Sequence, residues 1–102
     1  MALKKQFLKT DSSCKVSFRV PPEAAPDARA VFLVGDFNGW VENAEPMRKL
    51  KDGSFTATVK LATGRDYQFR YLVDGVEWIN DWDADRYEYN EFANGENSVV
   101  CV

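Results

Sequence analysis

The sequence is dominated by short runs in which apolar and polar residues alternate, and each run stops at turn-forming residues. Residues 67–73 are the clearest case, because Tyr67, Phe69, Tyr71 and Val73 fall on one face of an extended chain. An alternation of period two places one face of a β-strand in a core and the other in solvent. No long segment has the 3.6-residue period of an amphipathic helix. The pattern therefore predicts an all-β fold.

Further strands are predicted on the same grounds. They lie at residues 15–20, 29–34, 47–50, 55–61, 76–78 and 98–102, and residues 6–10 could pair as an edge strand. Pro21-Pro22 ends the strand at residues 15–20, because proline cannot donate a ladder hydrogen bond. Asp52-Gly53 and Asp74-Gly75 predict tight hairpins. The polar stretch 80–96 is predicted to be a loop that Tyr87, Tyr89 and Phe92 attach to the body.

About seven to eight short antiparallel strands, with turn signals every 8–12 residues or so, indicate an immunoglobulin-like β-sandwich. We expect a single domain over residues 1–102, because the sequence contains neither a linker nor an internal repeat. A chain of this size buries roughly 60–68% of its unfolded surface, which is enough for one core.

Charge and composition limit the classes of partner. A net charge of −3 argues against nucleic acid or an anionic membrane as the main partner. No run approaches the roughly 20 apolar residues of a membrane span, and no apolar segment after Lys4 and Lys5 suggests a signal peptide. We therefore expect a cytoplasmic protein. A bridge between Cys14 and Cys101 stays open, although a cytosolic domain usually keeps its thiols reduced.

The stretch of residues 31–40 joins a buried strand to an aromatic side chain on a turn. Val31 to Val34 are apolar, and Gly35, Asp36, Asn38 and Gly39 are residues that tight turns use. Trp40 follows at once. A large apolar side chain on a loop must pack inward or meet a ligand, so Trp40 is a candidate binding residue, with Phe37 as the inward anchor of the loop.

Several runs in order resemble carbohydrate-binding module family 48. They are residues 34–40 (VGDFNGW), 52–55 (DGSF), 67–75 (YQFRYLVDG), Trp78 and 96–100 (ENSVV). The family includes the early-set domains that precede isoamylase and branching-enzyme catalytic barrels, and the glycogen-binding domain of the AMP-activated protein kinase beta subunit. The resemblance covers roughly residues 28–102. It implies an immunoglobulin-like β-sandwich that binds α-1,4-glucans such as glycogen or starch.

The residues themselves give an independent reason for that function. Sugars have apolar C–H faces and polar edges, so a site needs flat aromatic platforms flanked by donors and acceptors. Trp40 and Trp78 lie outside the core alternation, and Arg70 lies on the outward face of its strand. Asn97 can donate and accept, which suits a pair of hydroxyl groups.

The resemblance to the kinase domain assigns roles to the same residues. Trp40 and Trp78 match its stacking tryptophans, Arg70 matches a sugar-contacting lysine, and Asn97 matches a sugar-bonding asparagine. Arginine keeps the charge but changes the geometry. Ala93 and Gly95 depart further from that domain. Near these positions the kinase domain has a threonine and a leucine, and the leucine threads through a cyclic glucan.

Each candidate also has a structural alternative. Trp40 could cap the core, Trp78 could pack against Tyr71, Arg70 could pair with Glu77 or Asp74, and Asn97 could bond backbone in a turn. Trp82 is a weaker candidate that could extend the platform or cover the sandwich edge. Tyr87 and Tyr89 are expected to pack rather than bind.

Catalysis and metal binding are poorly supported. The sequence contains no histidine, which removes the commonest general base and metal ligand. Asp81, Asp83 and Asp85 are spaced like the start of a calcium loop, but Arg86 and Phe92 occupy the positions that need glycine and glutamate. We therefore expect no cofactor, no metal site and no enzyme activity in this chain.

The leading hypothesis is a non-catalytic module that binds α-1,4-glucan by tryptophan stacking and places itself, or a glycogen-metabolism enzyme or regulatory protein, on glycogen. The alternative is a structural or regulatory interaction module whose sugar site is vestigial. Exposure of Trp40 and Trp78 on one surface would favour the first hypothesis.

Overall fold

The computed structural model describes residue 1, residues 3–92 and residues 94–102. Most of the described residues with regular structure are in strands. The strands are β1 (Lys4–Phe7), β2 (Ser13–Val20), β3 (Val31–Gly35), β4 (Arg48–Lys49), β5 (Phe55–Ala62), β6 (Asp66–Val73), β7 (Glu77–Ile79), β8 (Arg86–Asn90) and β9 (Gly95–Cys101), with a short 3₁₀ turn, η1 (Asp36–Asn38), after β3.

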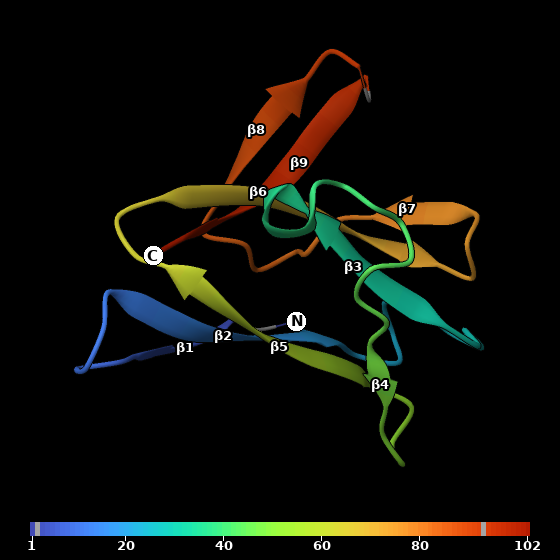
Figure 1. The fold of residues 1–102 in the computed structure, drawn as a ribbon. Coiled ribbons are helices and arrows are strands. Elements are labelled where there is room, and N and C mark those ends of the chain that lie inside the picture. Colours follow the sequence, from blue (N-terminus) through green and yellow to red (C-terminus); the bar gives the residue numbers. More distant parts are fainter. Residues whose placement is uncertain (2, 93) are drawn as a thin grey trace.

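The strands form two antiparallel sheets that pack as a sandwich (Figure 1). One sheet has the order β1-β2-β5-β4, and the other has the order β3-β6-β9-β8. Strand β6 organises the second sheet, because β3 pairs along one of its edges while β9 and β7 share the other. The predicted all-β, immunoglobulin-like β-sandwich is confirmed.

The core lies between the sheets and consists of the alternating residues that the sequence assigns to it. Val16, Phe18 and Val20 of β2 are fully buried, as are Phe69 and Tyr71 of β6. The rings of Phe18 and Phe69 meet edge to face, with their centroids 5.0 Å apart. Edge-to-face contact is a favoured arrangement of aromatic rings, so these two strands fix the two sheets against each other.

A second, smaller apolar layer lies on the outer face of the β3-β6-β9 sheet. Val34, Leu72 and Val99 point away from the main core, yet all three are almost completely buried. Leu72 is the direct cross-strand partner of Trp78 on β7. This layer underlies the surface on which the candidate binding residues lie.

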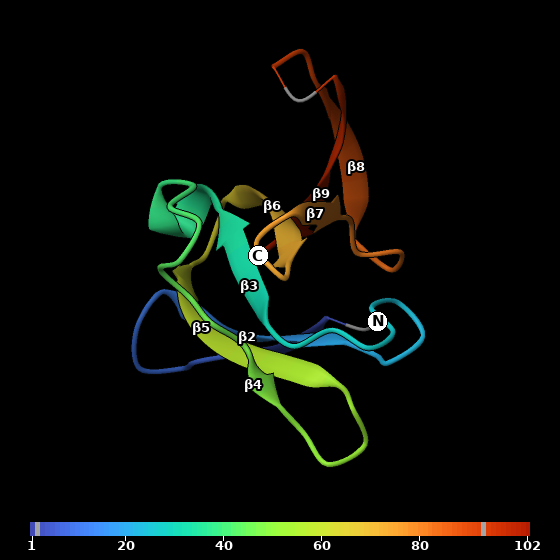
Figure 2. The ribbon, with the colours of Figure 1, turned by 90° about the vertical axis from the view of Figure 1, so that its right-hand side faces the viewer.

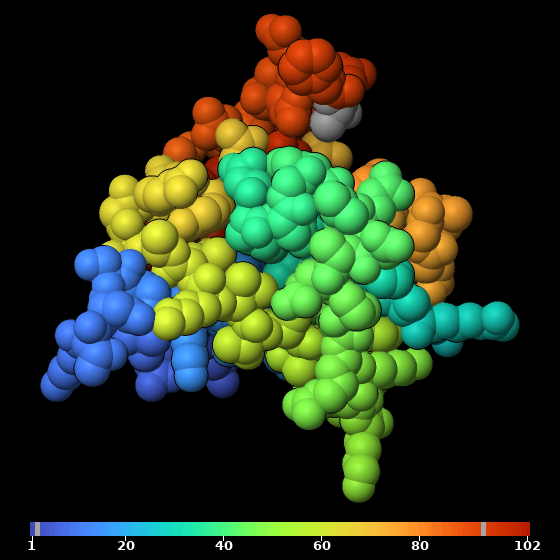
Figure 3. All heavy atoms as spheres, viewed as in Figure 1, coloured from blue at the N-terminus to red at the C-terminus, as the bar shows by residue number. Residues whose placement is uncertain are grey.

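The C-terminal part of the chain corrects the sequence prediction. Residues 80–96 do not form one loop, because β8 occupies Arg86–Asn90 and pairs with β9 from Arg86↔Val99 to Asn90↔Gly95. The resulting β8–β9 hairpin projects from the sandwich (Figures 2 and 3). Phe92, predicted to pack against the body, is 102% exposed near the tip of the hairpin.

The other predicted strands are present, with bounds that differ by a few residues from those expected. The edge strand expected at residues 6–10 is β1, at Lys4–Phe7. Cys14 is buried, Cys101 is half-buried, and both thiols are free. Among the described residues, none forms a helix long and apolar enough to cross a membrane.

Candidate functional site

Trp40 is positioned by the turn that follows β3. The Asn38 side chain closes this turn, since its Oδ1 accepts from the Gly35 amide (3.1 Å) and its Nδ2 donates to the Leu33 carbonyl (2.9 Å). Gly39 has a φ of 65° and Trp40 a φ of 60°. Phe37 turns inward as expected, with its ring centroid 5.7 Å from that of Phe18.

The left-handed backbone at Trp40 is itself informative. A bulky residue in this conformation costs on the order of 1–2 kcal/mol and persists only where its surroundings enforce it. Here the Trp40 amide donates to the Gly35 carbonyl (3.0 Å), and its indole Nε1 donates to Asp36 Oδ1 (2.8 Å). The other carboxylate oxygen of Asp36 accepts from the Gln68 amide (2.8 Å). The indole is therefore oriented from β6 as well as from its own turn.

Trp78 comes from β7, on the other side of the outer face. It pairs with Leu72 across β6, and it is 39% exposed. Tyr71 points into the core, so the alternative in which Trp78 packs against it is wrong. One part of the indole covers the outer apolar layer, and the rest is free for a ligand.

Arg70 and Asn97 form a hydrogen-bonded pair beneath the two tryptophans. Arg70 Nε donates to Asn97 Oδ1 and Arg70 Nη2 donates to the Glu96 carbonyl, both at 2.6 Å. Asn97 Nδ2 donates to Gln68 Oε1 (2.9 Å). Pairing of Arg70 with Glu77 or Asp74 is not observed among the described residues. Arg70 is thus held in place and half-exposed.

Asn97 is only 1% exposed, with its amide oxygen bonded to Arg70 and its amide nitrogen to Gln68. The main contribution of Asn97 is therefore to orient Arg70. Within the described part of the chain, Arg70 Nη1 has no hydrogen-bond partner. The guanidinium therefore retains donors that can point toward a ligand.

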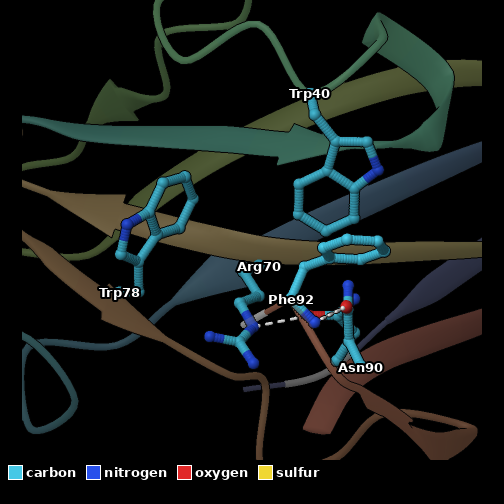
Figure 4. Close-up of a pocket in the computed structure, with 6 residues that line it drawn as sticks. Trp40, Arg70, Trp78, Asn90 and Phe92 are labelled. Carbon is cyan, nitrogen blue, oxygen red and sulfur yellow. Dashed lines mark hydrogen bonds between the residues drawn. The ribbon is translucent and has the colours of Figure 1, made fainter. Parts of the chain in front are cut away.

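These side chains line one hollow of about 330 Å³ (Figure 4). Its lining consists of Trp40, Arg70, Trp78, Asn90, Phe92 and Asn97. The structure thus brings together the four main residues that the sequence singled out. Trp82 is not among the lining residues; it is 54% exposed on the loop before β8.

Asn90 and Phe92 are the site residues that sequence reasoning missed. The Asn90 side chain accepts from the Phe92 amide (2.9 Å), and both residues line the hollow from the side of the hairpin (Figure 4). The sequence did contain features that could have predicted this hairpin. Apolar and polar residues alternate at residues 86–90, and Asn94-Gly95 follows as a turn signature. Gly95 begins β9, and Ala93, the other departure noted in the sequence, lies outside the described residues.

The loop that carries Trp82 is anchored from beneath. Asp81 is buried, accepts from the Tyr71 hydroxyl (2.7 Å), and accepts from the Asp83 amide (2.8 Å). Burial raises the pKa of the Asp81 carboxyl, and burial together with Asp81 raises the pKa of Tyr71 well above its usual value. Asp81 is thereby a structural residue. Within the described residues no cluster of His, Cys, Asp and Glu could hold a metal ion.

The arrangement offers two indole rings and a phenyl ring beside one charged donor and two amides. Aromatic rings provide apolar platforms, and the guanidinium and amide groups provide directed hydrogen bonds. None of the lining residues is a carboxylate, a thiol or a hydroxyl nucleophile. The site can therefore hold a flat molecule that has apolar faces and polar edges.

Comparison with known proteins gives an independent result. The model of carbohydrate-binding module 48, the isoamylase N-terminal domain, matches residues 15–87. This segment contains Trp40, Arg70 and Trp78 and ends before Phe92 and Asn97.

Curated relatives are similar to part of the chain. The 1,4-alpha-glucan branching enzyme GlgB of Butyrivibrio fibrisolvens is 33% identical over 75 residues, which are 72% of this chain and 12% of that protein. The enzyme of the same name from Oceanobacillus iheyensis is 45% identical over 47 residues, which are 42% of this chain and 7% of that protein. This chain therefore corresponds to a small part of each relative.

Proposed function

Because the chain belongs to carbohydrate-binding module family 48, we propose that it binds α-1,4-glucan chains in the hollow between Trp40 and Trp78. The observation that carries the proposal is the convergence of these two tryptophans, from separate segments of the chain, on one surface. The curated relatives are named as enzymes of 1,4-alpha-glucan, which favours this sugar over other neutral ones.

Each side chain has a distinct part in the proposed complex. The indoles of Trp40 and Trp78 stack on the apolar faces of glucose units, and Phe92 closes the hollow on the side of the hairpin. Arg70 donates to sugar hydroxyls, while Asn97 acts chiefly by orienting Arg70 through the 2.6 Å bond. The site thus separates stacking residues from a hydrogen-bonding residue.

The role we infer is binding without catalysis. Glycoside hydrolysis needs two carboxylates on either side of the scissile bond, and no lining residue is a carboxylate. The sequence also contains no histidine to serve as a general base. The module then serves to place a longer protein or a partner on a glucan. Incubation with glycogen should release no new reducing ends, and their release would contradict this role.

Co-sedimentation with glycogen tests the binding proposal. The wild-type chain should pellet with glycogen, and millimolar maltoheptaose should release it. Trp40→Ala should pellet much less than wild type, whereas Phe7→Ala should behave as wild type. Phe7 is a matched control because it is an aromatic residue that is 56% exposed on β1, in the other sheet. Equal pelleting of all three proteins, or of none, would contradict the proposal and favour an interaction module with a vestigial sugar site.

A further inference from the structure

The face of the β8–β9 hairpin that points away from the hollow also carries exposed aromatic side chains. Tyr89 is 62% exposed and Tyr87 is 39% exposed. Trp82, on the loop before β8, is 54% exposed. The hollow uses none of these three residues. Exposed apolar groups that gather on a projecting element are a mark of a binding surface.

The pairing of the two strands assigns these residues to a face. Glu88 pairs with Asn97, so Glu88, Asn90 and Asn97 share the face that turns toward Trp40 and Trp78. Side chains of a strand alternate between its faces. Tyr87 and Tyr89, which pair with Ser98 and Glu96, therefore lie on the opposite face. Two residues along a strand place them roughly 7 Å apart.

Polar contacts of the hydroxyl groups orient the two tyrosines, strongly for Tyr87 and weakly for Tyr89. The Tyr87 hydroxyl donates to the Asp81 carbonyl (2.5 Å), which places its ring beside the loop that carries Trp82. The Tyr89 hydroxyl lies 3.4 Å from Asn94 Oδ1, near the tip of the hairpin, which is at most a weak contact. Rings fixed at the hydroxyl end lose little conformational freedom when a ligand covers their faces.

We propose that Trp82, Tyr87 and Tyr89 form a second glucan-binding surface, the rear face, on the back of the β8–β9 hairpin. The identity of its ligand rests on the proposed function of the hollow, because both sites would take the same neutral sugar. One hairpin would then separate two bound glucan segments. Two sites on one module raise its affinity for a polymer through effective concentration.

Size argues for a sugar ligand over a protein partner. Each of the three side chains is about half exposed, so together they offer on the order of 300 Å². A stable protein interface needs roughly 800 Å² from each partner. A short glucan segment needs only a few ring faces with polar groups beside them.

Charge excludes anionic ligands from the rear face. Glu96 is exposed and lies opposite Tyr89 in the hairpin, and Asp83, which follows Trp82, is 58% exposed although it pairs with the N-terminal ammonium (3.7 Å). Carboxylates accept hydrogen bonds from sugar hydroxyls, but they repel phosphate groups and nucleic acid. The rear face thus suits a neutral, hydroxyl-rich ligand.

The three tryptophans allow one NMR titration to separate the two sites. The indole N–H signals of Trp40 and Trp78 report on the hollow, and those of Trp82 and the Tyr89 amide report on the rear face. On addition of maltoheptaose to the 15N-labelled chain, we expect all of these signals to move. If the signals of Trp40 and Trp78 move while those of Trp82 and Tyr89 stay, the rear face is refuted and the hollow stands. If only the rear-face signals move, the proposed function of the hollow fails and the rear face stands.

Variants test the same inference without relying on chemical shifts. In a Trp40→Ala/Trp78→Ala background, maltoheptaose should still move the Tyr89 amide signal. Adding Trp82→Ala should weaken that residual binding by about five- to tenfold, from the apolar surface of one indole face, and adding Phe7→Ala should leave it unchanged. Tyr89→Ala, read at the Trp82 indole, should give the same loss. Residual binding unaffected by both rear-face substitutions would overturn the proposal, as would capture of a protein there without any response to sugar.

Discussion

Replacing Trp78 by alanine removes one of the two proposed platforms with little effect on the fold. The side chain is 39% exposed, which corresponds to roughly 100 Å² of an indole. A sugar ring covers one face, or about half of that area, so at about 25 cal/mol/Å² stacking contributes about 1.3 kcal/mol. Trp78→Ala should therefore weaken maltoheptaose binding about tenfold. Stability should fall by roughly 1–3 kcal/mol, because the part of the indole that covers the outer apolar layer is removed as well.

Intrinsic fluorescence measures this loss, since Trp40 remains in the variant to report on the hollow. Phe7→Ala is the matched control and should bind within a factor of two of wild type. The reasoning is refuted if Trp78→Ala binds as tightly as the control. It is also refuted if Trp78→Ala no longer unfolds cooperatively in urea, because the loss of affinity would then reflect the loss of the fold.

Three further changes test the scaffold around the site by urea unfolding. Gly35→Ala should cost at least about 2 kcal/mol, because its Cβ would lie 2.5 Å from the Gln68 carbonyl oxygen. Tyr71→Phe should cost about 1–3 kcal/mol, because buried Asp81 loses a hydrogen bond. Hydrogen bonds from the Ala30 and Arg29 amides lower the pKa of the Asp74 carboxyl in the folded state. The charged Asp74 therefore stabilises the fold fully above the pKa of the unfolded state, near 3.8. This contribution is lost as the pH falls from there through the lower pKa of the folded state. The stability of Asp74→Asn should therefore fall less steeply below about pH 4; equal slopes would contradict this.

The sandwich could be predicted because its core strands are half-buried. In β6 the alternation of Phe69 and Tyr71 with Gln68 and Arg70 fixes which side chains face inward, and the structure confirms it. The position of Trp40 outside this alternation was equally visible in the sequence. Periodicity reports on burial, so it identifies strands that have one face in a core.

The same reasoning explains why the hairpin was missed. Strand β8 has no fully buried residue, because it projects beyond the sandwich. Its polar composition therefore resembled a loop, and Phe92 was wrongly assigned to packing. The bond between Asn97 and Arg70 could not be predicted either, because it depends on the register of β9 against β6, which strand composition does not specify.

Calorimetric titration with maltoheptaose tests the central claim, that Trp40 and Trp78 form one glucan platform, most directly. The wild-type chain should bind weakly, with a dissociation constant between micromolar and millimolar, because stacking on two platforms together with a few hydrogen bonds only modestly exceeds the entropic cost of association. The Trp40→Ala/Trp78→Ala variant should bind about a hundredfold more weakly if the two losses add. A double variant within a few-fold of wild type, or a wild-type chain that releases no heat at millimolar sugar, would contradict the claim.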